Sequence, residues 1–425
     1  MLILLAVVTI DYFCSFIIAN NGHNNARFFL VISLFSGFGI LLYFKYLKLI
    51  LLTFNQMNYL FLVKNLPIGI SFFVFQSSSY VIDVFKRKIE PVRSYLDYLL
   101  YICFFPQLVA GPIMRAEKFF PQLENLFLPS LLEKKFAKVL FFLLSGYLKK
   151  SVLSDSVAPI ADHIYSYYNV YSWDSILIGL IAYSIQIYFD FSGYTDIARG
   201  SALIFGIELP ENFSSPYISI GFSEFWTRWH ISLSLWLKEY LYFSIGGNRY
   251  GVSRTFVNLL LTMFLGGLWH GASWNFAFWG FLHGVYLSIE RLFKLIPMSI
   301  TPLKLKNSRF WKVFLFSIRL IIVYSVVTLT WVFFRANSFE DSLNILTKLI
   351  RFDSGSSLGY SDRNLIQIVF LLMMIFSFIS DRFTHEIEEF LNQNVTQLKL
   401  FLASFLLIIM ILLSRESKPF IYFVF

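Results

Sequence analysis

The chain has 425 residues, of which 57% are hydrophobic and only 14% are charged, and it contains 51 phenylalanines. This is far more apolar surface than one soluble core of this length would bury, so we predict a polytopic membrane protein. The formal net charge of +9 is typical of the excess of Lys and Arg in cytoplasmic loops. We find no Gly-rich phosphate loop, no zinc-ligand spacing and no aromatic-basic pattern, which excludes those nucleotide, metal and nucleic-acid classes.

Near-continuous apolar stretches predict roughly ten or eleven transmembrane or re-entrant helices, because one crossing needs about 20 residues. They lie at about 1–20, 28–52, 66–82, 96–113, 136–148, 174–192, 255–269, 272–289, 313–334, 365–380 and 397–413. No basic residue precedes the first stretch and no small-residue cleavage site follows it, so we interpret it as a retained span. Without an internal repeat or a long polar linker, we expect a single membrane-embedded domain over 1–425.

Polar residues concentrate at the end of one apolar stretch, in "IYFDFSGYTDIARG". A charged group there would cost about 2.5 to 3.5 kcal/mol at the middle of a bilayer, so Asp190 and Asp196 must be paired, solvated or near an interface. On a continuous helix Asp190 and Tyr194 share a face, whereas a break at Gly193 would separate them. The cluster either fixes helix packing or lines a substrate path, and the sequence leaves both open.

The segment 225–251, "FWTRWHISLSLWLKEYLYFSIGGNRYG", follows this polar cluster. Four of its residues lie close to one stripe at helical spacing: Trp229, Ser232, Trp236 and Tyr240. We therefore predict an amphipathic helix, which on composition alone would be anchored at the membrane interface and would end in a turn at "GGN". His230 is either a structural hydrogen-bonding residue of this helix or part of a site.

Two more histidines, His270 and His283, lie in the Trp- and Phe-rich segment "GGLWHGASWNFAFWGFLHG". On an unbroken helix they would be about 20 Å apart and could not act on the same atoms. Gly267 and Gly271 flank His270, and a helix break there would leave His270 at a junction facing a cavity. Otherwise His270 is a packed, hydrogen-bonded ring.

The most basic loop, 291–312, holds no acidic residue. Its cations are Arg291, Lys294, Lys304, Lys306, Arg309 and Lys312. We expect this loop on the cytoplasmic side. The alternative is that such a basic face binds an anionic ligand, such as the phosphates of a nucleotide-like donor.

Several of these segments together resemble the membrane-bound O-acyltransferase family. They are "SYVIDVFKRKIEPVRSYLDYLLYICFFPQLVAGPIMRAEKFFPQL", "IYFDFSGYTDIARGSALIFGIELPENFSSPYIS", "EFWTRWHISLSLWLKEYLYFSIGGNR", "GGLWHGASWNFAFWGFLHG" and "WVFFRA". The match runs in order from about residue 10 to the terminal "FIYFVF", and it is strongest for the bacterial branch that modifies alginate, peptidoglycan and teichoic acid. Relatives begin with further apolar segments before "VTIDYFCSFI", so we expect this chain to lack one or two N-terminal spans.

The resemblance implies an all-α bundle around a central tunnel, through which an acyl group passes from a cytoplasmic donor to an acceptor outside. It implies acetyl-CoA as the donor substrate, with no bound cofactor and no metal. The family's essential histidine corresponds to His270, and His230 matches a second polar position of the family site. His283 matches a position that is structural.

The expected chemistry suits these residue types. A sugar hydroxyl becomes a good nucleophile when a base removes its proton, and imidazole is matched to that role near neutral pH. We therefore expect His270 to be the base, with His230, Tyr194 or a backbone amide near Gly267 stabilising the oxyanion. The substrate-lining candidates are Asp190, Tyr194, Asp196, Trp229 and Trp269.

The sequence thus predicts a multi-pass O-acetyltransferase of the bacterial inner membrane. Its acceptor would be an extracytoplasmic polysaccharide, either an alginate-like exopolysaccharide or peptidoglycan, and its expected partner an SGNH-type acetyltransferase outside the membrane. D-alanyl transfer to teichoic acid is the alternative within the family. A glycan-precursor transporter, or a scaffold without catalytic activity, are the alternatives outside it.

Overall fold

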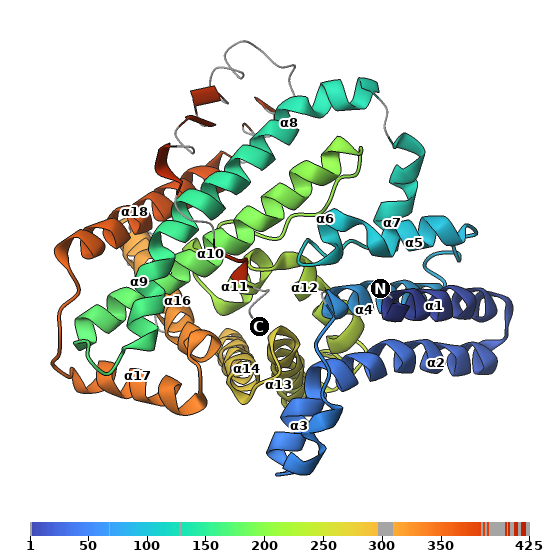
Figure 1. Cartoon of the computed structure of the whole chain (residues 1–425), viewed down its shortest axis with the longest axis horizontal. Helices are drawn as coiled ribbons and strands as arrows, with labels where there is room; N and C mark the ends of the chain where they lie inside the picture. Colours follow the sequence, from blue (N-terminus) through green and yellow to red (C-terminus); the bar gives the residue numbers. More distant parts are fainter. Residues whose placement is uncertain are drawn as a thin grey trace. The chain divides into compact units, whose positions relative to one another are not determined.

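The computed structural model describes residues 2–67, 69–126, 129–295, 309–383, 386, 389–390, 404–405, 407–408, 412–414 and 418–421. Its described elements are helices, which confirms the predicted all-α class (Figure 1). Contacts divide the chain into two compact units. The first comprises Met1–Leu143 with Ile197–Pro210, and the second comprises Leu144–Asp196 with Glu211–Phe425. The single domain expected over 1–425 stays a prediction.

The first unit is built around three mutually packed helices, α1, α2 and α4. Its elements are α1 (Leu2–Asn20), α2 (His23–Leu41), η1 (Leu42–Tyr46), α3 (Leu47–Thr53), η2 (Met57–Leu62), α4 (Ile70–Phe85), α5 (Tyr95–Cys103), α6 (Phe105–Leu108), α7 (Ala116–Phe119) and η3 (Phe120–Asn125). Two further helices, α8 (Pro129–Tyr147) and α10 (Trp173–Ile204), contribute residues to both units. The predicted stretch 96–113 is not one helix, because α5 ends at Cys103 and the short α6 begins at Phe105 with Pro106 in its first turn.

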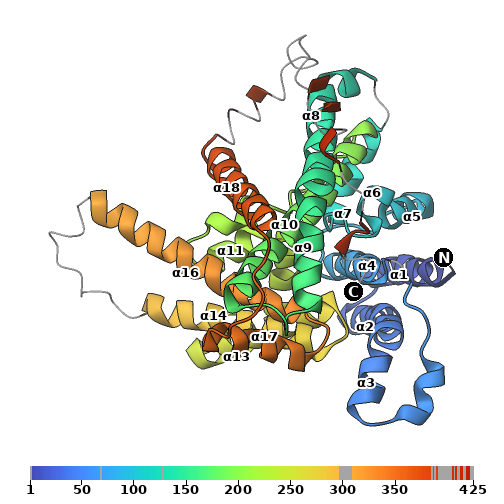
Figure 2. The same ribbon diagram turned by 60° about the vertical axis from the view of Figure 1, so that its left-hand side comes forward.

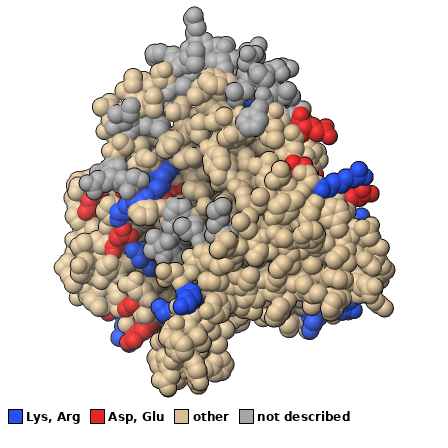
Figure 3. Space-filling model, turned by 45° about the vertical axis from the view of Figure 1, so that its right-hand side comes forward, with Lys and Arg blue, Asp and Glu red and all other residues tan. Residues whose placement is uncertain are grey.

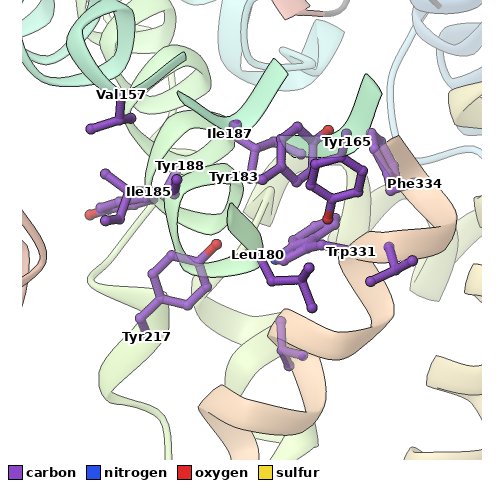
Figure 4. Packing of buried hydrophobic residues seen from close by; sticks show 14 of the residues in the cluster. Val157, Tyr165, Leu180, Tyr183, Ile185, Ile187, Tyr188, Tyr217, Trp331 and Phe334 are labelled. Carbon is purple, nitrogen blue, oxygen red and sulfur yellow. The ribbon is translucent and has the colours of Figure 1, made fainter. Parts of the chain in front are cut away.

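The second unit holds the remaining helices. They are η4 (Leu148–Ser154), α9 (Asp155–Ser166), η5 (Pro216–Ile218), α11 (Phe222–Arg228), α12 (Ile231–Trp236), η6 (Leu237–Tyr242), α13 (Gly251–His270), α14 (Trp274–Leu295), α16 (Arg309–Arg335), α17 (Phe339–Arg351) and α18 (Tyr360–Arg382). Its core is rich in aromatic rings: Figure 4 shows Tyr165 of α9 and Tyr183 of α10 close to Trp331 and Phe334 of α16. Such rings bury large areas and pack edge to face, which stiffens the core.

Among the residues that the structure describes, six helical segments are long and apolar enough to cross a membrane: Leu2–Asn20, His23–Thr53, Trp173–Ile204, Gly251–His270, Arg309–Arg335 and Tyr360–Arg382. Predicted stretches near 66–82 and 272–289 form the further apolar helices α4 and α14. The face in Figure 3 carries wide areas without acidic or basic side chains. The predicted polytopic membrane protein is therefore confirmed. The stretch 397–413 and the middle of the basic loop 291–312 lie largely outside the described residues, so the cytoplasmic placement of that loop stays a prediction.

Helices α13 and α14 form a tightly packed hairpin (Figure 2). A Cβ on Gly267 would lie 2.2 Å from the carbonyl oxygen of Phe276 and 3.0 Å from Cα of Gly280. Glycine at both positions thus lets the two backbones touch. The hairpin turns directly after His270, at Gly271. The break that Gly267 and Gly271 predict is confirmed, and the separation of about 20 Å expected on an unbroken helix is wrong.

Segment 225–251 is not one amphipathic helix. It is interrupted at Trp229 and His230, because His230 adopts a φ of +43°, which an α-helix cannot accommodate. The predicted stripe is buried inside the protein, although composition suggested an interfacial position. The predicted turn at 246–248 is present.

Gly193 does not break α10, which continues from Trp173 to Ile204. A Cβ at this position would lie 2.8 Å from the carbonyl oxygen of Gly146. Gly193 therefore allows two segments of the second unit to approach closely. It does not break the helix, so Asp190 and Tyr194 remain on one continuous helix.

Candidate active site

His270 is the last residue of α13 and is 5% exposed. Its imidazole packs edge to face against three aromatic rings, with centroid distances of 5.1 Å to Trp269, 5.3 Å to Trp279 and 5.3 Å to Phe334. Because the helix ends at this residue, the ring lies at the junction between α13 and α14. This is the junction position that the flanking glycines predicted.

His230 is brought to the same place by a short backbone pairing. The amide of Ser214 donates to Arg228 O at 3.0 Å and that of Ile231 donates to Asn212 O at 3.0 Å. Asn212 Oδ1 also accepts a hydrogen bond at 3.1 Å from the amide of Ser232, which lies in the first turn of α12. These bonds hold the chain on both sides of the left-handed His230, and such strained backbone persists only where the surroundings impose it.

The His230 and His270 rings lie with centroids 6.2 Å apart, and Trp269 lies beside both. His230 also packs at 90° against Phe191 of α10, with centroids 4.7 Å apart. Its side chain is fully buried, and burial lowers its pKa to about 3. His230 is therefore neutral at physiological pH, with one N–H to donate and one lone pair to accept.

Neither ring nitrogen of His230 has a hydrogen-bond partner among the residues that the structure describes. Leaving a buried polar atom unpaired costs about 1–3 kcal/mol, and such atoms in folded proteins call for an explanation. A substrate that carries a carbonyl or hydroxyl group would supply the missing partner. Within the described chain, no group of three His, Cys, Asp or Glu side chains is arranged to hold a metal ion.

Tryptophans enclose the histidine pair from one side. The indole of Trp229 is fully buried and lies 5.0 Å from that of Trp331, which stacks on Trp279 at 5.5 Å. Trp279 in turn contacts His270. Trp229 thus supports this enclosure through Trp331, whereas Trp269 contacts both imidazoles directly.

The polar residues of α10 are engaged in ion pairs. Asp190 lies 2.7 Å from Lys150, and Asp196 lies 2.6 Å from Lys149. Tyr194 stacks on Phe420 with centroids 4.4 Å apart. The structure thus places Asp190 and Asp196 against lysines and Tyr194 against Phe420.

A late segment of the chain, 418–421, contacts the same region and was missed by sequence reasoning. The amide of Ile421 donates to Asp190 Oδ2 at 2.8 Å, and Phe420 lies 5.7 Å from Phe191, the ring that covers His230. Lys418 pairs with Asp162, which also binds Arg335 at 2.7 Å. No local pattern relates these residues, and only their aromatic and basic character could have drawn attention to them.

His283 packs against the same indole as His270, that of Trp279. Its ring centroid is 4.8 Å from that of Trp279, and its Nε2 lies 3.1 Å from Thr330 Oγ1. His283 is fully buried and also packs against Trp226 at 5.2 Å. The histidine of "FLHG" therefore makes packing contacts, in line with the structural role that the resemblance implies.

The family model of the membrane-bound O-acyltransferases matches residues 28–333. The chain belongs to this family. The match contains His230, His270 and His283 together with the hairpin that carries the last two. The family membership that the sequence motifs indicated is thus confirmed.

Several bacterial members of the membrane-bound O-acyltransferase family are similar to this chain. A probable alginate O-acetylase of Azotobacter vinelandii is 38% identical over 345 residues, which cover 79% of this chain and 65% of that protein. A peptidoglycan O-acetyltransferase of Helicobacter pylori is 33% identical over 376 residues, or 82% of this chain and 69% of that protein. A teichoic acid D-alanyltransferase of Bacillus subtilis is 28% identical over 245 residues, or 53% of this chain and 59% of that protein. The chain spans about half to two thirds of the length of the alginate O-acetylases that it matches.

Proposed function

We propose that this protein is an O-acetyltransferase that passes an acetyl group from a cytoplasmic donor, acetyl-CoA, toward hydroxyl groups of an extracytoplasmic polysaccharide. The acceptor is an alginate-like exopolysaccharide or peptidoglycan, and the membrane is the bacterial inner membrane. The observation that carries the proposal is the pair of buried imidazoles 6.2 Å apart, of which His230 has no hydrogen-bond partner among the described residues. Similarity to relatives named for O-acetyl transfer to alginate and peptidoglycan supports it.

His270 is the general base in this proposal. It accepts the proton of the acceptor hydroxyl while the hydroxyl oxygen attacks the thioester carbonyl carbon. The carbon–sulfur bond then breaks, the ester remains on the acceptor, and the proton on His270 passes to the leaving thiolate. Atoms and charges balance without a metal or an external oxidant.

His230 stabilises the oxygen of the thioester carbonyl as negative charge develops on it. Because burial keeps the ring neutral, its N–H is available as a donor at all physiological pH values. The surrounding indoles of Trp269 and Trp279 exclude bulk water, which would otherwise hydrolyse the activated acyl group. The expected partner in this proposal is an SGNH-type acetyltransferase outside the membrane.

The test compares His270→Gln and His230→Gln with His163→Gln, a histidine of α9 that is exposed. Ester-linked acetate is released from purified surface glycan by mild base and is normalised to the amount of membrane-inserted protein. We expect His270→Gln to lower the amount of ester-linked acetate at least a hundredfold and His230→Gln to lower it less. The control should leave it unchanged. Near-normal acetate from His270→Gln would refute the proposal, and release of D-alanine in place of acetate would favour the teichoic acid alternative.

A further inference from the structure

A groove of about 460 Å³ lies in the first unit, remote in sequence from the histidines. It forms where α1 ends and where the chain between α4 and α5 returns alongside that end. Its volume falls within the range of sites for small molecules and headgroups. The candidate active site makes no use of it.

The lining of the groove is mainly cationic. Arg87, Lys88 and Arg93 contribute three positive charges, against one carboxylate from Glu90, and Lys88 also pairs with Asp83 at 3.4 Å. The four lining side chains are exposed. The groove therefore offers a positive field to a ligand that arrives from outside.

The groove is held in shape by hydrogen bonds to the helices around it. Tyr12 of α1 donates its hydroxyl to the carbonyl oxygen of Arg93 at 2.5 Å, and the amide of Val92 donates to the hydroxyl of Tyr80 at 3.0 Å. Arg87 adopts a φ of +58° and donates to the carbonyl oxygen of Ala19 at 2.5 Å. A site whose backbone is already fixed binds without a large ordering cost.

The floor of the groove is apolar and belongs to a membrane span. Phe16 and Ala19 lie in the last turns of α1, which is one of the segments able to cross a bilayer and ends at Asn20. On the same helix Phe13 is 59% exposed, as expected for a face toward lipid. The cationic rim thus lies where a span meets the headgroup layer, and basic residues in that layer attract anionic lipid.

We propose that this groove binds the phosphate of an anionic phospholipid headgroup, whose acyl chain begins along Phe16. The guanidinium of Arg93 contacts the phosphate oxygens. That of Arg87, which donates to the carbonyl oxygens of Ala19 and Asn21, adds positive charge beside it. Arginine suits this role because its planar fork matches a phosphate.

The test uses the full-length protein in mild detergent, with retained lipid counted by native mass spectrometry after addition of phosphatidylglycerol or phosphatidylcholine. The variants are Arg93→Gln and Arg93→Glu, which alter an exposed side chain and leave the backbone bond to Tyr12 in place. The matched control is Arg254→Gln, an exposed arginine of α13 outside the groove. Elution volume and unfolding midpoint confirm that each variant is folded.

We expect phosphatidylglycerol to be retained in preference to phosphatidylcholine. Arg93→Gln should weaken its retention about fivefold, the factor for one basic side chain at an anionic surface, and Arg93→Glu should weaken it further. Equal retention of the two lipids, or equal weakening by Arg254→Gln, would overturn the proposal. Binding of inorganic phosphate without any lipid preference would overturn it as well, because the ligand would then be a free anion.

Discussion

The imidazole rings of His230 and His270 lie with centroids 6.2 Å apart and with their planes inclined at 62°. One ring is fixed by a left-handed residue between two short helices, and the other by the end of a long helix at a glycine. The position of each ring is therefore set by the backbone. Substitutions that change the packing around the rings should for this reason affect catalysis and stability to different degrees.

His283→Ala should lower stability while leaving acetylation per folded molecule largely intact. The substitution removes a buried ring that packs on Trp279 and bonds Thr330, so we expect a loss of about 2–4 kcal/mol in the free energy of unfolding. The unfolding midpoint in detergent and the acetate assay measure the two effects. Thr330→Val is the control, because it removes only the hydroxyl partner and should cost about 1 kcal/mol. A hundredfold loss of activity at unchanged stability would assign His283 to the chemistry.

Gly267→Ala should destabilise the α13–α14 hairpin. Its Cβ would lie 2.2 Å from the carbonyl oxygen of Phe276, so the helices must separate, at a cost of about 1–3 kcal/mol or more. The control is Gly39→Ala in α2, whose Cβ would meet Phe35 only at 3.9 Å and should be neutral or stabilising. The amount of folded protein after purification distinguishes them, and equal recovery would contradict the close crossing.

Asp190→Asn should destabilise more than Asp196→Asn. The Asp190 side chain is 1% exposed and holds both Lys150 and the amide of Ile421, whereas that of Asp196 is 11% exposed. Removing one partner of a buried ion pair costs about 3–5 kcal/mol when the other charge is left alone, and we expect a smaller loss here because Lys150 keeps Asp155 at 2.8 Å. We expect activity per folded molecule to fall by less than tenfold. A much larger fall at unchanged unfolding midpoint would make Asp190 a substrate-lining residue.

The stability of the protein should fall below pH 6.5 in a way that depends on His230. Burial lowers the pKa of His230 from 6.5 to about 3 in the folded state. Above pH 6.5 the His230 imidazole is neutral in both the folded and the unfolded state, so its contribution to stability is constant. As the pH falls through 6.5, only the unfolded state takes up the proton, so stability is lost, approaching about 1.4 kcal/mol per pH unit until about pH 3.

The measurement is the unfolding midpoint of the wild type and of His230→Gln at pH 7.5, 6.5, 5.5 and 4.5. Other groups titrate in both proteins, so the difference between the two profiles isolates His230. The unfolding midpoint of the wild type should fall relative to that of His230→Gln as the pH falls. Parallel profiles would show that His230 takes up its proton equally well in the folded state.

Local sequence patterns predicted much of the fold and part of the site. The hydrophobic stretches gave the helices, and the glycines around His270 predicted where one of them ends, because glycine tolerates a break or a close approach. The same reasoning was ambiguous at Gly193, where the close approach holds and the break does not. Glycine has both uses, and only its neighbours in space decide between them.

The pairing that positions His230 could not be predicted from the sequence. It depends on Asn212 and Ser214, which carry no helical or strand periodicity and act through backbone atoms and the side-chain oxygen of Asn212. The 225–251 stripe was predicted on one helix at the membrane interface, but the chain breaks at Trp229 and His230 and the four residues are buried inside the protein, because tertiary contacts override local pattern and composition. The bonds from Ile421 and Lys418 are likewise tertiary, and connect residues with no shared local signal.

The ion pairs of α10 have a consequence for how the chain is made. During synthesis Lys149 and Lys150 emerge before Asp190 and Asp196, so each carboxylate enters the membrane when its cation is already available. The pair can then insert with little net charge, which lowers the cost of placing an acid at that depth. The amide of Ile421 emerges only after α18, so the contact that completes the surroundings of Asp190 becomes available long after α10 has been made.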